Sequence, residues 1–197
     1  MKDTVIVFAR APRLGLVKRR LAREIGHRRA LQFHARTLGR LLRKLGADRR
    51  FQSVLAITPD RARMPSLPAI TRIGQGRGDL GQRMYRAFRK YRTARVALIG
   101  SDIPGLSTGD IASAFRALGR SDAVFGPAED GGYWLIAMSP RRPARPFQRV
   151  RWSSRYTLGD TVENFAGRRV CLLRRLRDVD TAADLQVAER EGRRRFG

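Results

Sequence analysis

Short apolar runs that stop abruptly at polar turn residues alternate along this chain with longer segments of helical periodicity. The clearest run covers residues 96–99 and ends in Gly100, Ser101 and Asp102. A run of β-branched and aliphatic residues that is closed by turn residues predicts a buried strand. Because such runs alternate with helical segments, the sequence predicts an α/β fold built on a mostly parallel sheet.

The same reasoning gives the other elements and their order. We expect strands over 4–9, 54–57, 70–73, 96–99, 122–125, 133–138 and 170–173, and helices over 18–25, 28–45, 80–91, 108–118 and 155–165, with a last helix that opens at 180 or 181. The segment 133–138 follows its predecessor too closely for a helical crossover, so it predicts an antiparallel strand and a mixed sheet. A length of 197 residues suits one domain over residues 1–197.

The chain is strongly basic, with a formal net charge of +25 and 42 lysine and arginine residues, of which four are lysine. Such a charge attracts nucleic acid, anionic lipid or phosphorylated ligands. The arginines are spread over predicted helices, loops and the carboxyl-terminal tail, and no zinc-ligand spacing, basic heptad helix or aromatic RNA-binding signature accompanies them. We therefore interpret the charge as an arginine bias on an ordinary fold that attracts nucleic acid only nonspecifically. A non-catalytic nucleotide or nucleic-acid binding protein is the alternative from another functional class.

The sequence predicts neither a membrane-spanning segment nor a secretory signal. No apolar run approaches the roughly 20 residues of a membrane span. The apolar segment 4–9 is too short for a secretory signal, and no small-residue cleavage site follows it. The expected location is cytoplasmic.

Asp102 lies just beyond the carboxyl end of a predicted central strand. Open α/β sheets bind their ligands at that edge. A carboxylate there can hold a divalent cation, which in turn can hold the phosphates of a nucleotide. The alternative is that Asp102 only caps the turn into the helix that begins near Thr108, and residues 95–107 alone do not decide between the two.

Two basic or glycine-rich segments also follow predicted strands. The loop over 8–21 brings Lys18 and Arg20 to the start of a helix, which suits a polyphosphate, although this segment taken alone favours a solvated basic helix start. The turn over 74–84 is rich in glycine, which allows close backbone approach to a flat ligand. Gln75 could then hydrogen-bond a base edge, and a flexible turn is the alternative.

Acidic residues also follow the predicted strands over 122–125 and 170–173. The loop over 126–134 carries Glu129 and Asp130 before two glycines, an arrangement that can take up sugar hydroxyls, a metal or a proton, or can be a solvated turn. In the connection over 178–181, Asp180 could be a second metal ligand or a helix cap.

The sequence predicts no functional role for either histidine. His27 and His34 both fall on predicted helix surfaces, and neither has ligand partners at metal spacing.

Six segments occur in a specific order along the chain: FARAPRLGLVKRRLA, GRGDLGQRM, LIGSDIPGL, GPAEDGGYWLI, RWSS and RDVDTAADL. In that order they resemble the DUF2064 group of bacterial, glycosyltransferase-A-like proteins, which are also described as related to phospholactate guanylyltransferase and other nucleotidyltransferases. The resemblance runs from about Val5 to Leu185. Its most specific part is GSDIPG followed by GPAEDGGY.

This resemblance implies a nucleotide-diphospho-sugar transferase fold, which is a Rossmann-like three-layer α/β/α sandwich with a mixed, mostly parallel sheet. It also implies a transferase that binds a nucleotide sugar or nucleoside triphosphate together with Mg²⁺ or Mn²⁺. The implied reaction is metal-dependent transfer from a nucleotide sugar to an unknown small-molecule acceptor. The alternative is guanylyltransferase-like nucleotidyl transfer, which releases pyrophosphate.

The resemblance further implies roles for individual residues. The nucleotide-binding residues would be Ala9, Arg10, Gly15, Lys18, Arg20, Gln75, Asp79, Gly81 and Ser101. The metal ligands would be Asp102 and Asp180, and the acceptor-binding residues would be Glu129, Asp130, Gly131 and Gly132. The residues expected to act in catalysis are Lys18, Asp102 and Asp130.

The first loop departs from the family pattern, which usually reads KAPVPGRVKTRL where this chain reads RAPRLGLVKRRL. Arg10 stands in place of a lysine, Leu14 of a proline, Leu16 of an arginine and Arg19 of a threonine. The loop nevertheless keeps its cationic character through Lys18 and Arg20.

Overall fold

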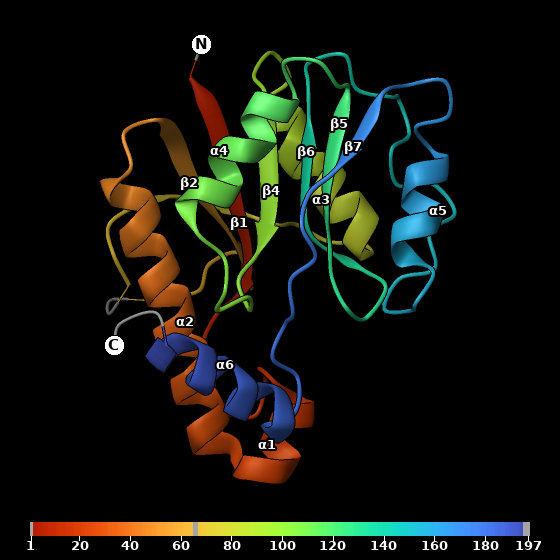
Figure 1. Ribbon diagram of the computed structural model, residues 1–197. Helices are drawn as coiled ribbons and strands as arrows, with labels where there is room; N and C mark the ends of the chain where they lie inside the picture. The colour runs from red at the N-terminus through yellow and green to blue at the C-terminus, as the bar shows by residue number, and fades with distance from the viewer. Residues whose placement is uncertain (1, 65–66, 195–197) are drawn as a thin grey trace.

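The computed structural model describes residues 2–64 and 67–194 and contains a seven-stranded sheet with the order β3-β2-β1-β4-β6-β5-β7 (Figure 1). The strands are β1 (Asp3–Arg10), β2 (Phe51–Thr58), β3 (Thr71–Gly74), β4 (Val96–Gly100), β5 (Ala123–Pro127), β6 (Tyr133–Met138) and β7 (Val170–Leu172). All strand pairings are parallel except those of β6, which runs antiparallel to both β4 and β5. The predicted mixed sheet is therefore confirmed, because the β5–β6 connection is too short for a crossover helix.

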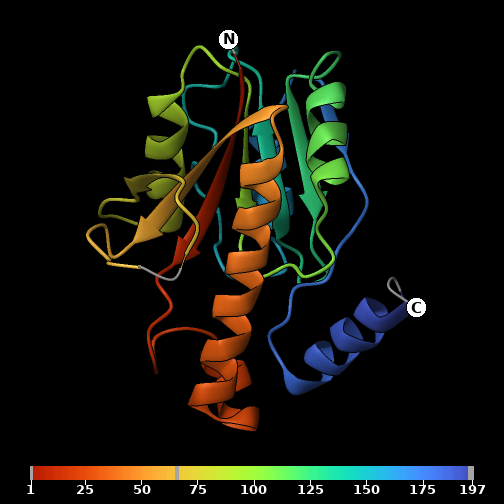
Figure 2. The same cartoon turned by 90° about the vertical axis from the view of Figure 1, so that its left-hand side faces the viewer.

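Six helices accompany the sheet within the described residues: α1 (Arg19–Ile25), α2 (His27–Ala47), α3 (Leu80–Lys90), α4 (Thr108–Ala117), α5 (Thr157–Glu163) and α6 (Ala182–Arg194). α2 and α4 cover one face of the sheet, and α3 and α5 cover the other (Figures 1 and 2). Side chains alternate between these faces along each strand, so Val7 of β1 joins the α2 and α4 side while Ile6 joins the α3 side. This is the three-layer α/β/α sandwich that the family resemblance implies.

A smaller apolar cluster lies beyond the carboxyl edge of the sheet. Leu21 and Ala22 of α1 pack there with Ala30 of α2 and Val179, the residue that leads into α6. Figure 1 shows α1, the start of α2 and α6 together below the ends of β1 and β4. This helical cluster covers the edge at which open α/β sheets bind ligands.

The predicted elements differ from the observed ones mainly at their ends. α1 and α2 are separated by Gly26 alone, which has a φ of 85°. The helix expected over 155–165 is shorter, because α5 begins at Thr157 and ends at Glu163. Among the residues that the structure describes, no helix is long and apolar enough to cross a membrane.

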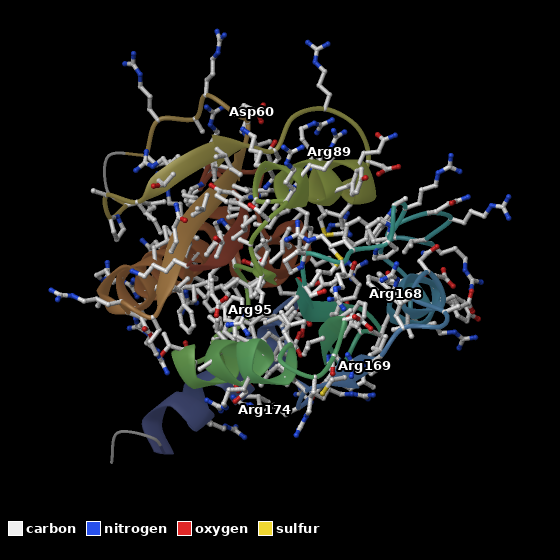
Figure 3. The ribbon with its side chains drawn as sticks, turned by 90° about the horizontal axis from the view of Figure 1, so that it is seen from above. Asp60, Arg89, Arg95, Arg168, Arg169 and Arg174 are labelled. Atoms are coloured by element: carbon white, nitrogen blue, oxygen red, sulfur yellow. The ribbon has the colours of Figure 1, made fainter. Side chains whose placement is uncertain are left out.

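The positive charge is distributed over many elements. Figure 3 views the molecule from the edge opposite to α1 and α6, and its labelled arginines come from different layers. Arg89 lies on the α3 side of the sheet and Arg174 on the α4 side, where its guanidinium is 2.6 Å from the Asp110 carboxylate. The labelled arginines thus agree with the dispersed charge read from the sequence.

Candidate functional site

Residues from four distant parts of the chain meet at the carboxyl ends of β1 and β4. Lys18 precedes α1, His34 lies within α2, Asp102 follows β4 and Asp180 precedes α6. The Lys18 ammonium group lies 3.1 Å from Asp102 Oδ2 and 3.0 Å from Asp180 Oδ1. The sequence placed three of these residues at one sheet edge, and the structure brings them into direct contact.

Asp102 is tied into this cluster by three side chains. Ser101 Oγ donates to its Oδ1 at 3.2 Å, and His34 Nδ1 lies 3.1 Å from the same oxygen. Burial alone would raise the pKa of Asp102, but the hydrogen bond from His34 and the charge of Lys18 outweigh it and hold this pKa well below its usual range. Asp102 is therefore an ionised carboxylate.

The alternative role of Asp102 as a helix cap is wrong. The N-cap of α4 is Ser107, whose hydroxyl accepts from the Asp110 backbone N–H at 3.2 Å, while Asp110 accepts in return from the Ser107 N–H at 2.9 Å. This capping box satisfies the start of α4. The Asp102 carboxylate is left to the cluster at the sheet edge.

Lys18 is held in an unusual backbone conformation. It is the N-cap of α1 with φ 47° and ψ 49°, a left-handed conformation that non-glycine residues seldom adopt. Its side chain is only 5% exposed, between the two carboxylates. Burial lowers the pKa of Lys18, but the charges of Asp102 and Asp180 more than compensate, so this pKa is raised and the amine stays protonated. Strained residues of this kind concentrate at functional sites.

Asp180 is free for this contact because a neighbour caps the last helix. Thr181 Oγ1 accepts from the Asp184 N–H at 3.2 Å, and Asp184 Oδ2 accepts from the Thr181 N–H at 2.9 Å. Arg20 adds a longer contact of 3.6 Å to Asp180. The side chain that caps α6 is therefore Thr181 and not Asp180.

Asp178 extends the acidic side of the cluster. Burial raises the pKa of Asp178, and the negative charges of Asp180 and Asp130 raise it further. Asp130 belongs to the β5–β6 loop. Because its charge and that of Lys18 both act on Asp178, this loop lies within electrostatic reach of the cluster.

His34 belongs to this cluster although the sequence did not predict it there. The prediction that it lies on a helix surface is wrong, since its side chain is 3% exposed and its Nε2 donates to the Arg10 carbonyl at 3.0 Å. A signal was present: His34 stands four residues after Ala30 and four before Leu38, both fully buried. That spacing puts it on the buried stripe of α2.

The glycine-rich turn is organised by Gln75, which is buried with 2% exposure. Its Nε2 donates to the carbonyls of Ala9 and Ala56, both at 2.9 Å, and its Oε1 accepts from Arg83 at 3.0 Å. The Gln75 amide, expected to face a base edge, is instead used to join β1, β2 and α3.

Two other residues assigned to this turn also have clear local contacts. Asp79 is the N-cap of α3 and accepts from the Gln82 N–H at 2.8 Å. Gly81 is buried, and a side chain there would meet Phe147 and Trp152 within 3 Å. Gly15 lies in the first loop with a φ of 75° and open space around it.

The β5–β6 loop carries the four residues expected to face an acceptor. Glu129 pairs with Arg177 at 2.6 Å, and Asp130 accepts from the Gly132 N–H at 2.8 Å. Gly131 has a φ of 85°, and a Cβ there would lie 2.4 Å from the Arg155 carbonyl oxygen. The close approach of two backbones thus requires glycine at this position.

The Asp102 and Asp180 carboxylates could hold a metal ion only together with water and ligand oxygens. Asp102 and Asp180 direct oxygens at one point, where the Lys18 ammonium now lies. Among the described residues, no group of three or more His, Cys, Asp or Glu is placed to hold a metal ion. Mg²⁺ commonly takes one or two carboxylates and completes its shell with water and phosphate oxygens, which suits this pair.

Comparisons with known proteins agree with the fold. The family model described as an uncharacterized protein conserved in bacteria (DUF2064) matches residues 41–154. A search of the curated proteins finds no match. A proposed nucleotide-diphospho-sugar transferase from Desulfovibrio desulfuricans G20 has a similar structure, with a TM-score of 0.86 and 28% identity over 97% of this chain and 88% of that chain.

More distant structures share the fold alone. The 4-diphosphocytidyl-2C-methyl-D-erythritol synthase from Anaerococcus prevotii DSM 20548 has a TM-score of 0.63 and 12% identity over 98% of each chain. Rv0371c from Mycobacterium tuberculosis H37Rv, in a complex with manganese, has a TM-score of 0.51 and 14% identity over 95% of this chain and 98% of that chain. The chain thus has the fold of the nucleotide-diphospho-sugar transferases.

Proposed function

The chain belongs to the DUF2064 family, and we propose that it is a metal-dependent transferase that moves a sugar from a nucleotide sugar to a small-molecule acceptor. The observation that carries this proposal is the Lys18 ammonium between the Asp102 and Asp180 carboxylates, at the carboxyl edge of β1 and β4. A charged cluster at that edge is where a doubly wound sheet binds a nucleotide. The name of the similar Desulfovibrio protein supports the same class.

The proposed roles follow the charges of the cluster. Asp102 and Asp180 would hold Mg²⁺ or Mn²⁺, which when bound supplies positive charge to a diphosphate leaving group. Lys18 and Arg20 would bind and orient the phosphates beside it. Ser101 keeps the Asp102 carboxylate in place through its 3.2 Å hydrogen bond.

The acceptor would enter beside the β5–β6 loop. Asp130 carries the carboxylate that would orient the acceptor hydroxyl and take its proton as the new glycosidic bond forms. Glu129, Gly131 and Gly132 shape the loop around it. The influence of the Asp130 charge on Asp178 supports this placement, because it brings the loop within electrostatic reach of the Lys18 cluster.

Nucleotidyl transfer is the second candidate. In that reaction an acceptor phosphate attacks the α-phosphorus of a nucleoside triphosphate, and pyrophosphate leaves. The similar fold of the Anaerococcus 4-diphosphocytidyl-2C-methyl-D-erythritol synthase favours it as an alternative. The two reactions differ in their second product, which is a nucleoside diphosphate in glycosyl transfer and pyrophosphate in nucleotidyl transfer.

A ligand screen tests the proposal. Thermal unfolding is followed with each nucleoside triphosphate and nucleotide sugar, with and without Mn²⁺, since a ligand that binds the folded state raises the Tm. We expect a Mn²⁺-dependent rise that is lost in Asp102→Ala and retained in Asp122→Ala, whose carboxylate pairs with Arg169 away from the site. Turnover of the selected nucleotide then identifies the leaving group. A wild-type protein that no nucleotide stabilises would contradict the proposal.

A further inference from the structure

The positive charges of Lys18 and Arg20 are already balanced by carboxylates. Lys18 contacts both Asp102 and Asp180, and Arg20 lies 3.6 Å from Asp180. The charges of Asp180 and Asp130 act on Asp178 in the same region. Before a metal binds, this side of the site has no surplus positive charge with which to attract a phosphate.

The opposite side of the β1 end has such a surplus. Arg83 Nη1 donates to Gln75 Oε1 at 3.0 Å, and Arg86 Nη1 donates to the Gln75 carbonyl at 2.7 Å. Arg10, at the end of β1, has an exposed side chain. Within residues 2–64 and 67–194, the ion pairs formed by carboxylates involve none of these three arginines.

Two carboxylates lie beside these three arginines, Asp60 in the segment after β2 and Asp79 at the start of α3, and each accepts from a backbone amide, so a net positive charge remains. Asp60 accepts from the Gly76 N–H at 3.0 Å, and Asp79 accepts from the Gln82 N–H at 2.8 Å. Burial lowers the pKa of Arg83, and the charges of Arg10 and Arg86 lower it further while that of Asp79 opposes them. The guanidinium groups therefore repel one another, and a bound anion would relieve that repulsion.

The buried Gln75 fixes the arginines in advance. Because its Nε2 donates to the carbonyls of Ala9 and Ala56, its Oε1 can point only toward Arg83. Gly76 makes room for Arg86, since a Cβ there would lie 2.5 Å from Arg86 Nη1. The donors are thus held by a buried side chain and by a glycine, and little side-chain freedom is lost when a ligand binds.

We infer that Arg10, Arg83 and Arg86 form a separate phosphate-binding subsite, on the other side of the β1 end from Asp102. Guanidinium groups are suited to this because each presents several N–H donors in a planar fork that matches a phosphate. That the bound phosphate is part of a nucleotide or acceptor substrate rests on the proposed function. Binding of the phosphate itself does not depend on it.

Calorimetry with inorganic pyrophosphate in EDTA tests the subsite without metal. Wild-type protein is compared with Arg83→Gln, Arg86→Gln and Arg10→Gln at one fixed salt concentration. The control is Arg116→Gln, which removes the same charge from α4, where Arg116 donates to the Ser113 hydroxyl. We expect the three subsite variants to bind about tenfold more weakly, the effect of losing one charge-assisted contact, and the control to bind as the wild type does.

Arg10→Gln keeps the test valid if an α3 variant folds poorly, because the Arg10 side chain is exposed. Equal weakening in all four variants would overturn the subsite, since it would mean attraction by net charge alone. Wild-type binding that is absent in EDTA, or that requires Mg²⁺ and Asp102, would overturn it too. Failure of the proposed function looks different: pyrophosphate would bind normally, while no nucleotide would give a Mn²⁺-dependent rise in Tm.

Discussion

Lys18 Nζ lies 3.1 Å from Asp102 Oδ2, so a cationic side chain of the protein itself contacts the residue expected to bind a metal. The same ammonium is 3.0 Å from Asp180, the second expected ligand. A divalent ion held by these two carboxylates would compete with Lys18 for their oxygens. The ammonium thus acts as a stand-in cation that keeps the two carboxylates together.

Removal of this ammonium should increase the response to a divalent ion. In Lys18→Met, Asp102 and Asp180 lose the charge that balances them, so we expect a lower Tm in EDTA and a larger rise on addition of Mn²⁺ than in the wild type. Lys44→Met is the control, because Lys44 is an exposed residue in the last turn of α2. Equal Mn²⁺ shifts in wild type and Lys18→Met would show that the ammonium and the metal do not share these oxygens.

His34 should contribute to both stability and ligand binding. His34→Ala leaves the Arg10 carbonyl without its donor and Asp102 without one of its partners. An unsatisfied buried group costs about 2 kcal/mol, so we expect that loss in the free energy of unfolding measured in urea. We also expect weaker Mn²⁺-dependent nucleotide binding.

His27→Ala is the matched control for this variant. His27 is an exposed residue of the first turn of the same helix. Exposed substitutions of this kind change stability by about 0.5 kcal/mol or less. Equal losses in the two variants would remove any special role for the His34 contacts.

The order of the elements and the edge that carries the site could be predicted from the sequence. Apolar runs such as 96–99 predict strands because a four-residue run closed by Gly100 and Asp102 is too short for a helix. Parallel strands then bring their carboxyl ends to one edge, which places Asp102 and Lys18 together. These inferences use the periodicity within each segment and the alternation of strands and helices along the chain.

Side-chain direction could not be predicted in the same way. The Gln75 segment predicts a turn, but whether the amide faces a ligand or the sheet depends on how α3 packs against β1 and β2. The buried stripe of α2 did carry a signal for His34, at four-residue spacing from Ala30 and Leu38. The pairing of His34 with Asp102 still requires the tertiary structure, because 68 residues separate them.

Asp160 should make stability depend on pH in the acid range. Its carboxylate accepts from the Arg151 backbone N–H at 2.9 Å and from its guanidinium at 2.9 and 2.7 Å. These hydrogen bonds from Arg151 lower the pKa of Asp160 to about 2. The unfolded value is about 3.9, so the contribution to stability is complete above it and is lost as the pH falls toward 2.

Asp160→Asn tests the predicted loss of stability at low pH. We expect the difference in Tm between wild type and variant to be largest above pH 5 and to shrink steadily down to pH 2. Thermal unfolding by circular dichroism at a series of pH values measures it. A difference that stays constant over this range would mean that ionisation of Asp160 is unimportant.

Gly131 should be the least replaceable glycine of the β5–β6 loop. Gly131→Ala places a Cβ at a φ of 85°, and that atom would lie 2.4 Å from the Arg155 carbonyl oxygen. Gly167→Ala introduces only the conformational part, since Gly167 has a φ of 74° with no atom within 4 Å of its added Cβ. A left-handed alanine costs about 1–2 kcal/mol, so we expect that loss for Gly167→Ala and a larger one for Gly131→Ala in urea unfolding. Equal losses would show that the loop moves away from Arg155 without cost, and the proposed acceptor side of the site would then be adaptable rather than fixed.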